Sequence, residues 1–195
     1  MAAPDPSCTP RILGIDPGTR VLGYGVVDLV VASTGAASTT GPGWQYVECG
    51  VIRADTALAM PQRIGTIAAE MLDVMDELRP TAVAIEAAFC GKNAASALKL
   101  GQIRGAMMVL AAQRELPVFE YGPTVVKRAV AGHGRATKCE LQARVQMLLG
   151  LRRAPTEDAA DALAIAMCHA NYISFPGGQQ SSGGQHSGPA GRVPA

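Results

Sequence analysis

The apolar and polar positions of the chain follow two different periods, and the order of these periods predicts the fold class. Short apolar runs bounded by Pro, Gly or charged residues predict strands. These runs lie at about 11–17, 21–31, 45–54, 81–86 and 116–121. Longer segments with apolar residues at helical spacing predict helices. These segments lie at about 60–79, 94–114, 123–131, 137–150 and 157–172.

The order of these elements predicts an α/β domain with a mixed sheet. The first two strands are separated only by a short turn at Pro17-Gly18, so they form an antiparallel hairpin. The later strands alternate with helices, which favours parallel strands joined by right-handed crossovers. We therefore expect a mixed β-sheet that is flanked by helices on both faces.

Length and composition indicate one folded domain with less ordered ends. The chain has 195 residues, of which 48% are hydrophobic and 17% charged, as is typical of soluble globular proteins. Residues 1–10 are expected to be a loose leader, and 32–44 a polar, glycine-rich loop. Residues 174–195 are rich in Gly, Ser and Gln and are expected to be disordered. The folded domain should therefore span 11–173.

Cysteine usage and hydropathy predict a cytoplasmic protein. The chain has five scattered cysteines and no C-x-x-C pair, which argues against a disulfide framework and against a structural zinc site. The first ten residues lack the apolar core of a signal peptide. No apolar run reaches the length of a membrane span. We expect no membrane association.

The charges are strongly sorted along the chain although the net charge is only +1. Residues 1–91 contain five arginines and ten acids, whereas 92–153 contain eleven Lys or Arg and three acids. A cationic segment of this size suggests a polyanionic partner. A solvated helix surface would give the same composition, so charge alone leaves both interpretations open.

Four carboxylates stand where solvated side chains are unusual. Asp16 and Glu86 each end an apolar strand. Strand ends of an α/β sheet converge at one edge, where sites are commonly formed. Asp158 and Asp161 are three residues apart at the start of an apolar helix, so they share a helix face that packs near this edge.

Carboxylates brought together in this way predict a metal-dependent site. They repel one another, and burying them unpaired is costly unless a cation is bound. Mg²⁺ prefers oxygen ligands, and two such ions about 4 Å apart can hold the attacking and leaving oxygens of a phosphodiester displacement. Structural roles are open as well: Asp158 at a helix N-terminus, Asp161 on the surface and Asp16 in a turn.

Four segments resemble a known family when they are taken together. They are "ILGIDPGTRVLGYGVVD" (12–28), "VAIEAAFCGKNAASALKLGQIRGAMM" (83–108), "LPVFEYGPTVVKRAVAGHGRATKCELQARV" (116–145) and "DAADALAIAMCHA" (158–170). Over about 11–173 the chain resembles the RuvC family of Holliday-junction resolvases. The first segment alone would be weak, because other RNase H-like and sugar-kinase-like proteins share a similar turn. The combination is specific.

The resemblance implies an RNase H-like fold with a five-stranded mixed sheet. It implies a homodimer that binds a four-way DNA junction and nicks two strands of like polarity, in recombination and DNA repair. The acidic site of the family falls on Asp16, Glu86, Asp158 and Asp161. These side chains would hold Mg²⁺, two ions per site, with Mn²⁺ able to substitute and water as the nucleophile. A branch-migration motor of the RuvAB type is implied as a further partner.

The resemblance also implies residues that contact DNA. The basic residues near the scissile strand match Lys127 and Lys138, and an aromatic residue that stacks on an unpaired base matches Phe89. With this substrate, further cations of the middle segment are expected along the phosphate backbone. They are Lys92, Lys99, Arg104, Arg128 and Arg135.

One glycine pair on the long helix has two possible roles. Gly101 and Gly105 are four residues apart, so they mark either a dimer face or tight packing on the sheet. His133 lies in a glycine-rich loop near the basic residues, and the sequence does not decide whether His133, Thr19 or Arg20 contacts DNA.

Three other functions remain as alternatives. In a nucleotide-binding, kinase-like module the Asp16-Pro17-Gly18-Thr19 turn would face a phosphate, but such a module needs a second, duplicated domain for which the chain is too short. A junction-binding protein without catalysis would not need the complete set of acids. A small RuvC-like nuclease that acts on RNA would share the first segment but would not be expected to have "DAADAL" or "ALKLGQIRG".

Overall fold

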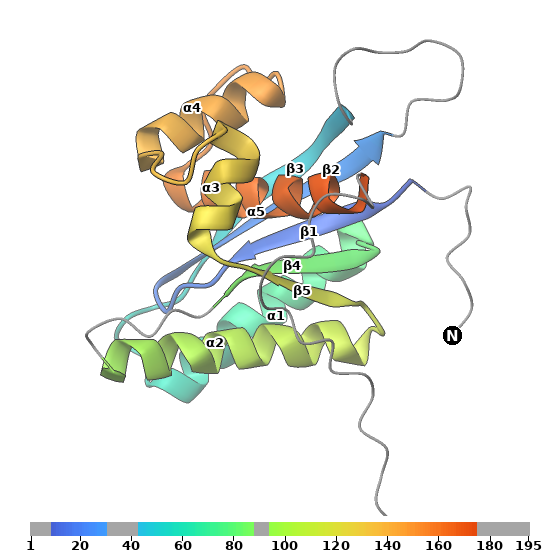
Figure 1. The fold of residues 1–195 in the computed structure, drawn as a ribbon. Coiled ribbons are helices and arrows are strands. Elements are labelled where there is room, and N and C mark those ends of the chain that lie inside the picture. Colours follow the sequence, from blue (N-terminus) through green and yellow to red (C-terminus); the bar gives the residue numbers. More distant parts are fainter. Residues whose placement is uncertain (1–8, 31–42, 88–93, 175–195) are drawn as a thin grey trace, which may run out of the picture.

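The computed structural model describes residues 9–30, 43–87 and 94–174, which form a five-stranded sheet with helices on both sides (Figure 1). The strands are β1 (Arg11–Asp16), β2 (Val21–Val30), β3 (Gly43–Arg53), β4 (Ala82–Glu86) and β5 (Val118–Tyr121). The helices are α1 (Met60–Leu78), α2 (Ala94–Gln113), α3 (Pro123–Ala131), α4 (Lys138–Leu148) and α5 (Glu157–Ser174). The predicted elements are all present.

The sheet is mixed, as the sequence predicts, with the order β3-β2-β1-β4-β5. β1 pairs antiparallel with β2, which pairs antiparallel with β3. β1 and β4 are parallel neighbours, and so are β4 and β5. The predicted α/β class and the five-stranded mixed sheet of the RNase H-like fold are therefore confirmed.

One face of the sheet is covered by α1 and α2 through large apolar side chains. Ile67, Met71 and Met75 of α1 and Ile103 and Met107 of α2 are buried against the strands. Their helical spacing is the pattern that predicts both helices. The same spacing leaves the opposite side of α2 in solvent.

The other face is covered by α5, with α3 and α4 packed beside it (Figure 1). α5 lies across β1 and β2 at very short range because strand glycines lie beneath it. A Cβ on Gly14 would be 2.1 Å from the carbonyl oxygen of Ala162, and one on Gly25 would be 2.7 Å from the backbone nitrogen of Leu163. No larger residue fits at these positions with α5 in its present place.

Some predictions concern residues outside the described ranges or differ from the structure at their limits. Phe89 and Lys92 lie outside the described residues, and so do nearly all of the leader, of the predicted loop at 32–44 and of the tail, whose first predicted residue, Ser174, ends α5. β3 begins at Gly43, two residues before its predicted start. Within the described residues, no helix combines the length and the apolar character that crossing a membrane requires.

Candidate active site

Asp16 and Glu86 lie side by side at one end of the sheet. They are the last residues of the parallel neighbours β1 and β4, in which Ile15 pairs with Ile85. The apolar residues before each carboxylate are buried, whereas the carboxylates themselves are half-buried. The strands therefore deliver both acids to the boundary between the core and solvent.

α5 brings the other two acids to the same edge. Gly23, which pairs with Asp16 across the β1–β2 hairpin, lies directly beneath the first turn of α5. A Cβ on Gly23 would be 2.1 Å from the carbonyl oxygen of Asp158. Asp161 follows three residues later on the same helix face. The close contact between a strand glycine and a helix backbone thus fixes the height of Asp158 and Asp161 above the strand ends.

The carboxylates lie close enough to one another to disturb their protonation. Burial, followed by the negative charges of Glu86, Asp161 and Asp158, raises the pKa of Asp16 from 3.8 to about 7. Burial followed by the charge of Asp161 raises the pKa of Glu86. The pKa of Asp161 is raised mainly by burial. Lys138 opposes all three shifts, Lys127 opposes those of Glu86 and Asp161, and Arg104 opposes that of Glu86, so nearby cations offset the negative charge of the edge only in part.

Two lysines line a pocket beside these acids. Lys127 of α3 and Lys138 of α4 share with Glu86 and Asp161 a pocket of about 150 Å³. Lys138 Nζ lies 3.7 Å from Asp161 Oδ2 and is hydrogen-bonded to Glu157, and this hydrogen bond raises the pKa of the ammonium group. Lys138 is therefore held in its charged form at the rim of the acidic edge.

Local capping fixes the position of Lys138. Thr137 is the N-cap of α4, and its hydroxyl accepts a hydrogen bond from the backbone N–H of Glu140. The carboxylate of Glu140 in turn accepts from the backbone N–H of Thr137 at 2.7 Å. This reciprocal pair of bonds is a capping box, and it places Lys138 at the first position of the helix.

The donor atoms at the edge suit a divalent cation. Asp16, Glu86, Asp158 and Asp161 offer only carboxylate oxygens, which are the ligands that Mg²⁺ prefers. Burial and the neighbouring carboxylates raise the pKa of Asp16, and a cation would stabilise its charged form. Within the described ranges, no three His, Cys, Asp or Glu side chains lie in the arrangement of a ready-made metal site.

The predicted DNA contacts fall into different environments. Arg128 and Arg135 are exposed and line a second, open pocket together with His133 and Thr124. Lys99 is exposed on α2. Cations therefore lie on both sides of α3, since Lys127 faces the acidic pocket and its neighbour Arg128 faces the second one.

The placement of Arg104 does not favour the predicted contact with DNA. Its side chain is only 11% exposed, and its Nη2 lies 2.8 Å from Oε2 of Glu120 on β5. The charge of Arg104 also lowers the pKa of Glu86, against the effect of burial. Arg104 thus acts inside the protein, between two glutamates.

The structure brings in residues that the sequence did not single out. His169 of α5 is buried, stacks on Phe119 with 4.1 Å between the ring centroids, and shares a 2.7 Å hydrogen bond with Tyr121 Oη. Burial lowers its pKa to about 4, so His169 is neutral at pH 7. Tyr121 pairs with Glu86 in the sheet, so this contact ties α5 to the strand beside the acidic edge. The only sign of this contact in the sequence is a single His within an otherwise apolar helix.

The fold and the site define the class of this protein as an RNase H-like domain with a carboxylate cluster at the strand ends. Residues 12–169 match the family model described as crossover junction endodeoxyribonuclease RuvC. A curated protein of that description from Magnetococcus marinus is 45% identical over 161 residues, which cover 83% of this chain and 84% of that protein. The chain therefore belongs to the RuvC family.

Solved structures agree with this assignment. The structure of Thermus thermophilus RuvC in complex with a Holliday junction substrate has a TM-score of 0.74 and 39% sequence identity, covering 85% of this chain and 96% of that one. A yeast mitochondrial Holliday junction resolvase has a TM-score of 0.56 at 11% identity, covering 84% of this chain and 80% of that one. The second likeness shows the fold alone.

Proposed function

We propose that the chain resolves four-way DNA junctions by hydrolysing phosphodiester bonds at the acidic edge of the sheet. The edge comprises Asp16, Glu86, Asp158 and Asp161. One observation carries the proposal: in a member of the crossover junction endodeoxyribonuclease family, carboxylates from two strands and one helix meet beside a pocket lined by two lysines. Metal ligands beside anion-binding groups suit the metal-assisted hydrolysis of a phosphodiester.

The four acids would hold Mg²⁺, with two ions per site and Mn²⁺ as a substitute. Bound in this way, the ions would activate a water molecule and offset the charge that develops on the phosphate. Asp16 and Glu86 are fixed by the pairing of β1 with β4, so their spacing is set by the sheet. Asp158 and Asp161 approach from α5 on the other side.

Lys127 and Lys138 would position the scissile phosphate and stabilise charge that develops on it. Both line the pocket that also contains Glu86 and Asp161. A phosphate bound in this pocket would therefore lie near two ammonium groups as well as near the carboxylates. Preorganised charges of this kind are effective in catalysis because they need no rearrangement during the reaction.

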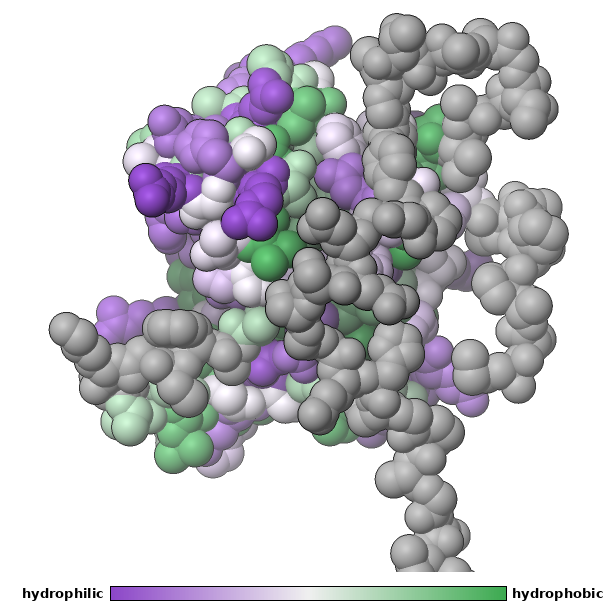
Figure 2. Space-filling view, in the orientation of Figure 1, coloured by the Kyte–Doolittle hydropathy of each residue, from purple (hydrophilic) through white to green (hydrophobic). Residues whose placement is uncertain are grey.

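The remaining exposed cations would bind the phosphate backbones of the junction arms. Figure 2 shows hydrophilic surface gathered over α3 and α4, the region that contains Arg128 and Arg135. Such contacts hold DNA without selecting a base sequence, and they make binding strongly dependent on salt. Lys92, Lys99 and Phe89 belong to the same proposal, with Phe89 stacking on an unpaired base.

Symmetric cleavage of two strands calls for two copies of the site, which a homodimer would supply. The solvent side of α2 fits such an interface, because Leu98 is 68% and Val109 55% exposed. Gly101 and Gly105 are exposed on that side, and among the described residues no atom lies within 4 Å of a Cβ added to either, which supports a dimer face rather than tight packing on the sheet. A branch-migration motor of the RuvAB type would deliver the junction to the dimer.

The proposal is tested by Asp16→Asn in a cleavage assay with a mobile four-way junction and a linear duplex of the same sequence. With Mg²⁺, the wild-type protein is expected to nick the junction in preference to the duplex. The variant should lose at least about a hundredfold in rate, which is the scale of electrostatic groups at a reacting centre, while still binding the junction. Asp73→Asn, an exposed acid on α1, is the matched control. Near wild-type cleavage by Asp16→Asn would refute the site.

A further inference from the structure

The acidic first part of the chain places three of its five arginines at the same end of the sheet as the carboxylates. Arg20 follows the turn after Asp16, and Arg53 is the last residue of β3, paired with Val21. Arg63 lies in the first turn of α1. The segment that contains them has twice as many acids as arginines, so this gathering of positive charge is local and not a consequence of composition.

Hydrogen bonds from Arg63 and from Ala54, the residue that follows β3, hold the turn between β1 and β2 in place. The guanidinium of Arg63 donates a hydrogen bond to the backbone carbonyl of Thr19. The backbone N–H of Ala54 donates to the carbonyl of Arg20 at 3.0 Å. The turn is also tight, because a Cβ on Gly18 would lie 1.8 Å from the carbonyl oxygen of Val21. Arg20 and Arg53 are therefore neighbours on a backbone that is fixed at three points.

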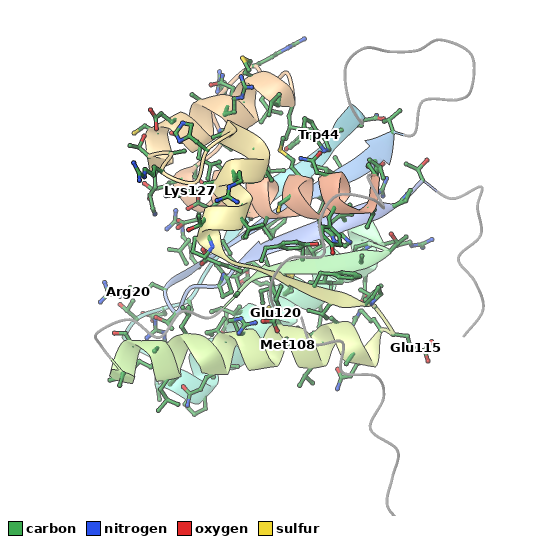
Figure 3. The ribbon with its side chains drawn as sticks, viewed as in Figure 1. Arg20, Trp44, Met108, Glu115, Glu120 and Lys127 are labelled. Atoms are coloured by element: carbon green, nitrogen blue, oxygen red, sulfur yellow. The ribbon has the colours of Figure 1, made fainter. Side chains whose placement is uncertain are left out.

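Among the described residues, the side chains of Arg20 and Arg53 have no acidic partner. Both residues are exposed, and within residues 9–30, 43–87 and 94–174 neither forms an ion pair. Figure 3 shows Arg20 projecting outward at the strand ends, and Lys127 on α3 on the other side of the strand-end region. Two guanidinium groups on adjacent backbones, with no carboxylate to pair with, favour an external anion.

We propose that Arg20 and Arg53 bind backbone phosphates of the DNA strand on the β2–β3 side of the acidic edge, opposite Lys127 and Lys138. The inference rests on the proposed function and adds a second row of phosphate contacts to it. A DNA strand that approaches four carboxylates is repelled unless cations hold it on each side of them. Guanidinium groups suit this role because their planar set of donors matches phosphate oxygens.

The test is the salt dependence of junction binding, measured by fluorescence anisotropy with a labelled four-way junction in the absence of divalent cations. NaCl is varied over about 50–200 mM, where the logarithm of the affinity falls linearly with the logarithm of salt. The variants are Arg20→Ala, Arg53→Ala and the double variant, with Arg20→Lys as the charge-preserving change. Arg79→Ala is the matched control, because Arg79 is exposed at the other end of the sheet, next to Leu78, whose carbonyl accepts from Arg11.

The slope of this plot should become shallower by about 0.9 for each phosphate that the variant no longer neutralises, and by more in the double variant than in either single variant. Arg20→Lys and Arg79→Ala should keep the wild-type slope. An unchanged slope in the folded double variant overturns the inference, and so does an equal change in Arg79→Ala. Arg20→Gln replaces Arg20→Ala if the alanine variant fails to fold.

Failure of the inference and failure of the proposed function give different results. If the slopes are unchanged but Asp16→Asn still abolishes nicking, the acidic site stands and the second row of contacts does not. If the wild-type protein fails to cleave junctions with Mg²⁺, the proposed function fails whatever the slopes show.

Discussion

The two faces of the sheet are packed by opposite means. On the α1–α2 face, long side chains such as Ile67, Met71 and Met107 fill the space between helix and strands. On the α5 face that space has almost vanished, because strand glycines contact the helix backbone and six of the buried residues of α5 are alanines. We call the α1–α2 face, which is filled by long side chains, the thick side. We call the α5 face, where small residues allow the backbones to touch, the thin side.

The two faces therefore contribute differently, one mainly to stability and the other mainly to the exact position of a helix. A thick apolar layer buries more surface and so contributes more to stability. A thin layer contributes less, but it fixes the position of a helix closely because backbone atoms cannot give way. The acids of α5 lie on the thin side, where their position matters most. The solvent side of α2 lies over the thick side.

The largest expected effect is the free-energy cost of ionising Asp16 in the folded protein. Folding raises the pKa of Asp16 from 3.8 to about 7, which corresponds to a penalty on the order of 4 kcal/mol once the group ionises, at about 1.4 kcal/mol per pH unit. A carboxyl whose pKa is raised on folding stabilises the protein below pH 3.8, and this stabilisation is lost as pH rises to about 7.

Thermal or denaturant unfolding without divalent cations, measured from pH 4 to pH 8, checks this expectation. Wild-type stability should fall across that range, and Asp16→Asn should fall less and be the more stable protein at pH 8. Parallel curves for the two proteins would show that folding does not raise the pKa of Asp16.

A smaller effect is expected where the thin side is thickened. In Gly23→Ala the new Cβ meets the carbonyl oxygen of Asp158, and backbone cannot rotate away as a side chain can. Overpacking of this kind costs about 1–3 kcal/mol, and a displacement of about 1 Å at a reacting group can reduce the rate a hundredfold. Chemical denaturation and nicking of a four-way junction should therefore both respond, the nicking rate more strongly. A Gly23→Ala protein with normal nicking would mean that α5 is not held by this contact.

The smallest effect is expected on the solvent side of α1, outside both packed faces of the sheet. Gly65 is exposed within α1, and among the described residues no atom lies within 4 Å of an added Cβ. Gly65→Ala should stabilise the protein by about 0.5–1 kcal/mol, because alanine favours the helix, and it should leave nicking unchanged. Denaturation curves of the two glycine variants, recorded together, compare a crowded strand glycine with an open helix glycine. Destabilisation by Gly65→Ala would show that the surface of α1 has no room for the added methyl group.

Much of the fold follows from the sequence because its signals are local. The period of the apolar residues identifies every strand and helix, and the Pro17-Gly18 turn predicts the hairpin. The carboxylates are found by a simple rule, since Asp16 and Glu86 end strands that prove to be parallel neighbours. Gly23 and Gly25 could be read as gaps on one strand face, but not as contact points for α5, because that requires the position of a helix more than 130 residues later.

Contacts between residues that are far apart in the sequence explain the features that the sequence could not predict. Arg104 was grouped with the DNA contacts because its segment is rich in cations, but the packing of α2 against β5 brings Glu120 to it. The bond from Arg63 to Thr19 joins a helix to a turn 44 residues away, and no local pattern predicts it. The same holds for His169, whose partner Tyr121 lies 48 residues earlier.

The origin of two of the four carboxylates in α5 also has a consequence for the newly made chain. Asp16 is synthesised early and Glu86 midway, but Asp158 and Asp161 emerge only with the last helix of the described structure. That helix can pack only on a hairpin whose glycines are already aligned. A chain that ends before α5 would lack half of the acids, and a misfolded chain would not bring them together, so on the proposed function neither could cut DNA. Only a completely folded chain would then have an active site that can cleave DNA.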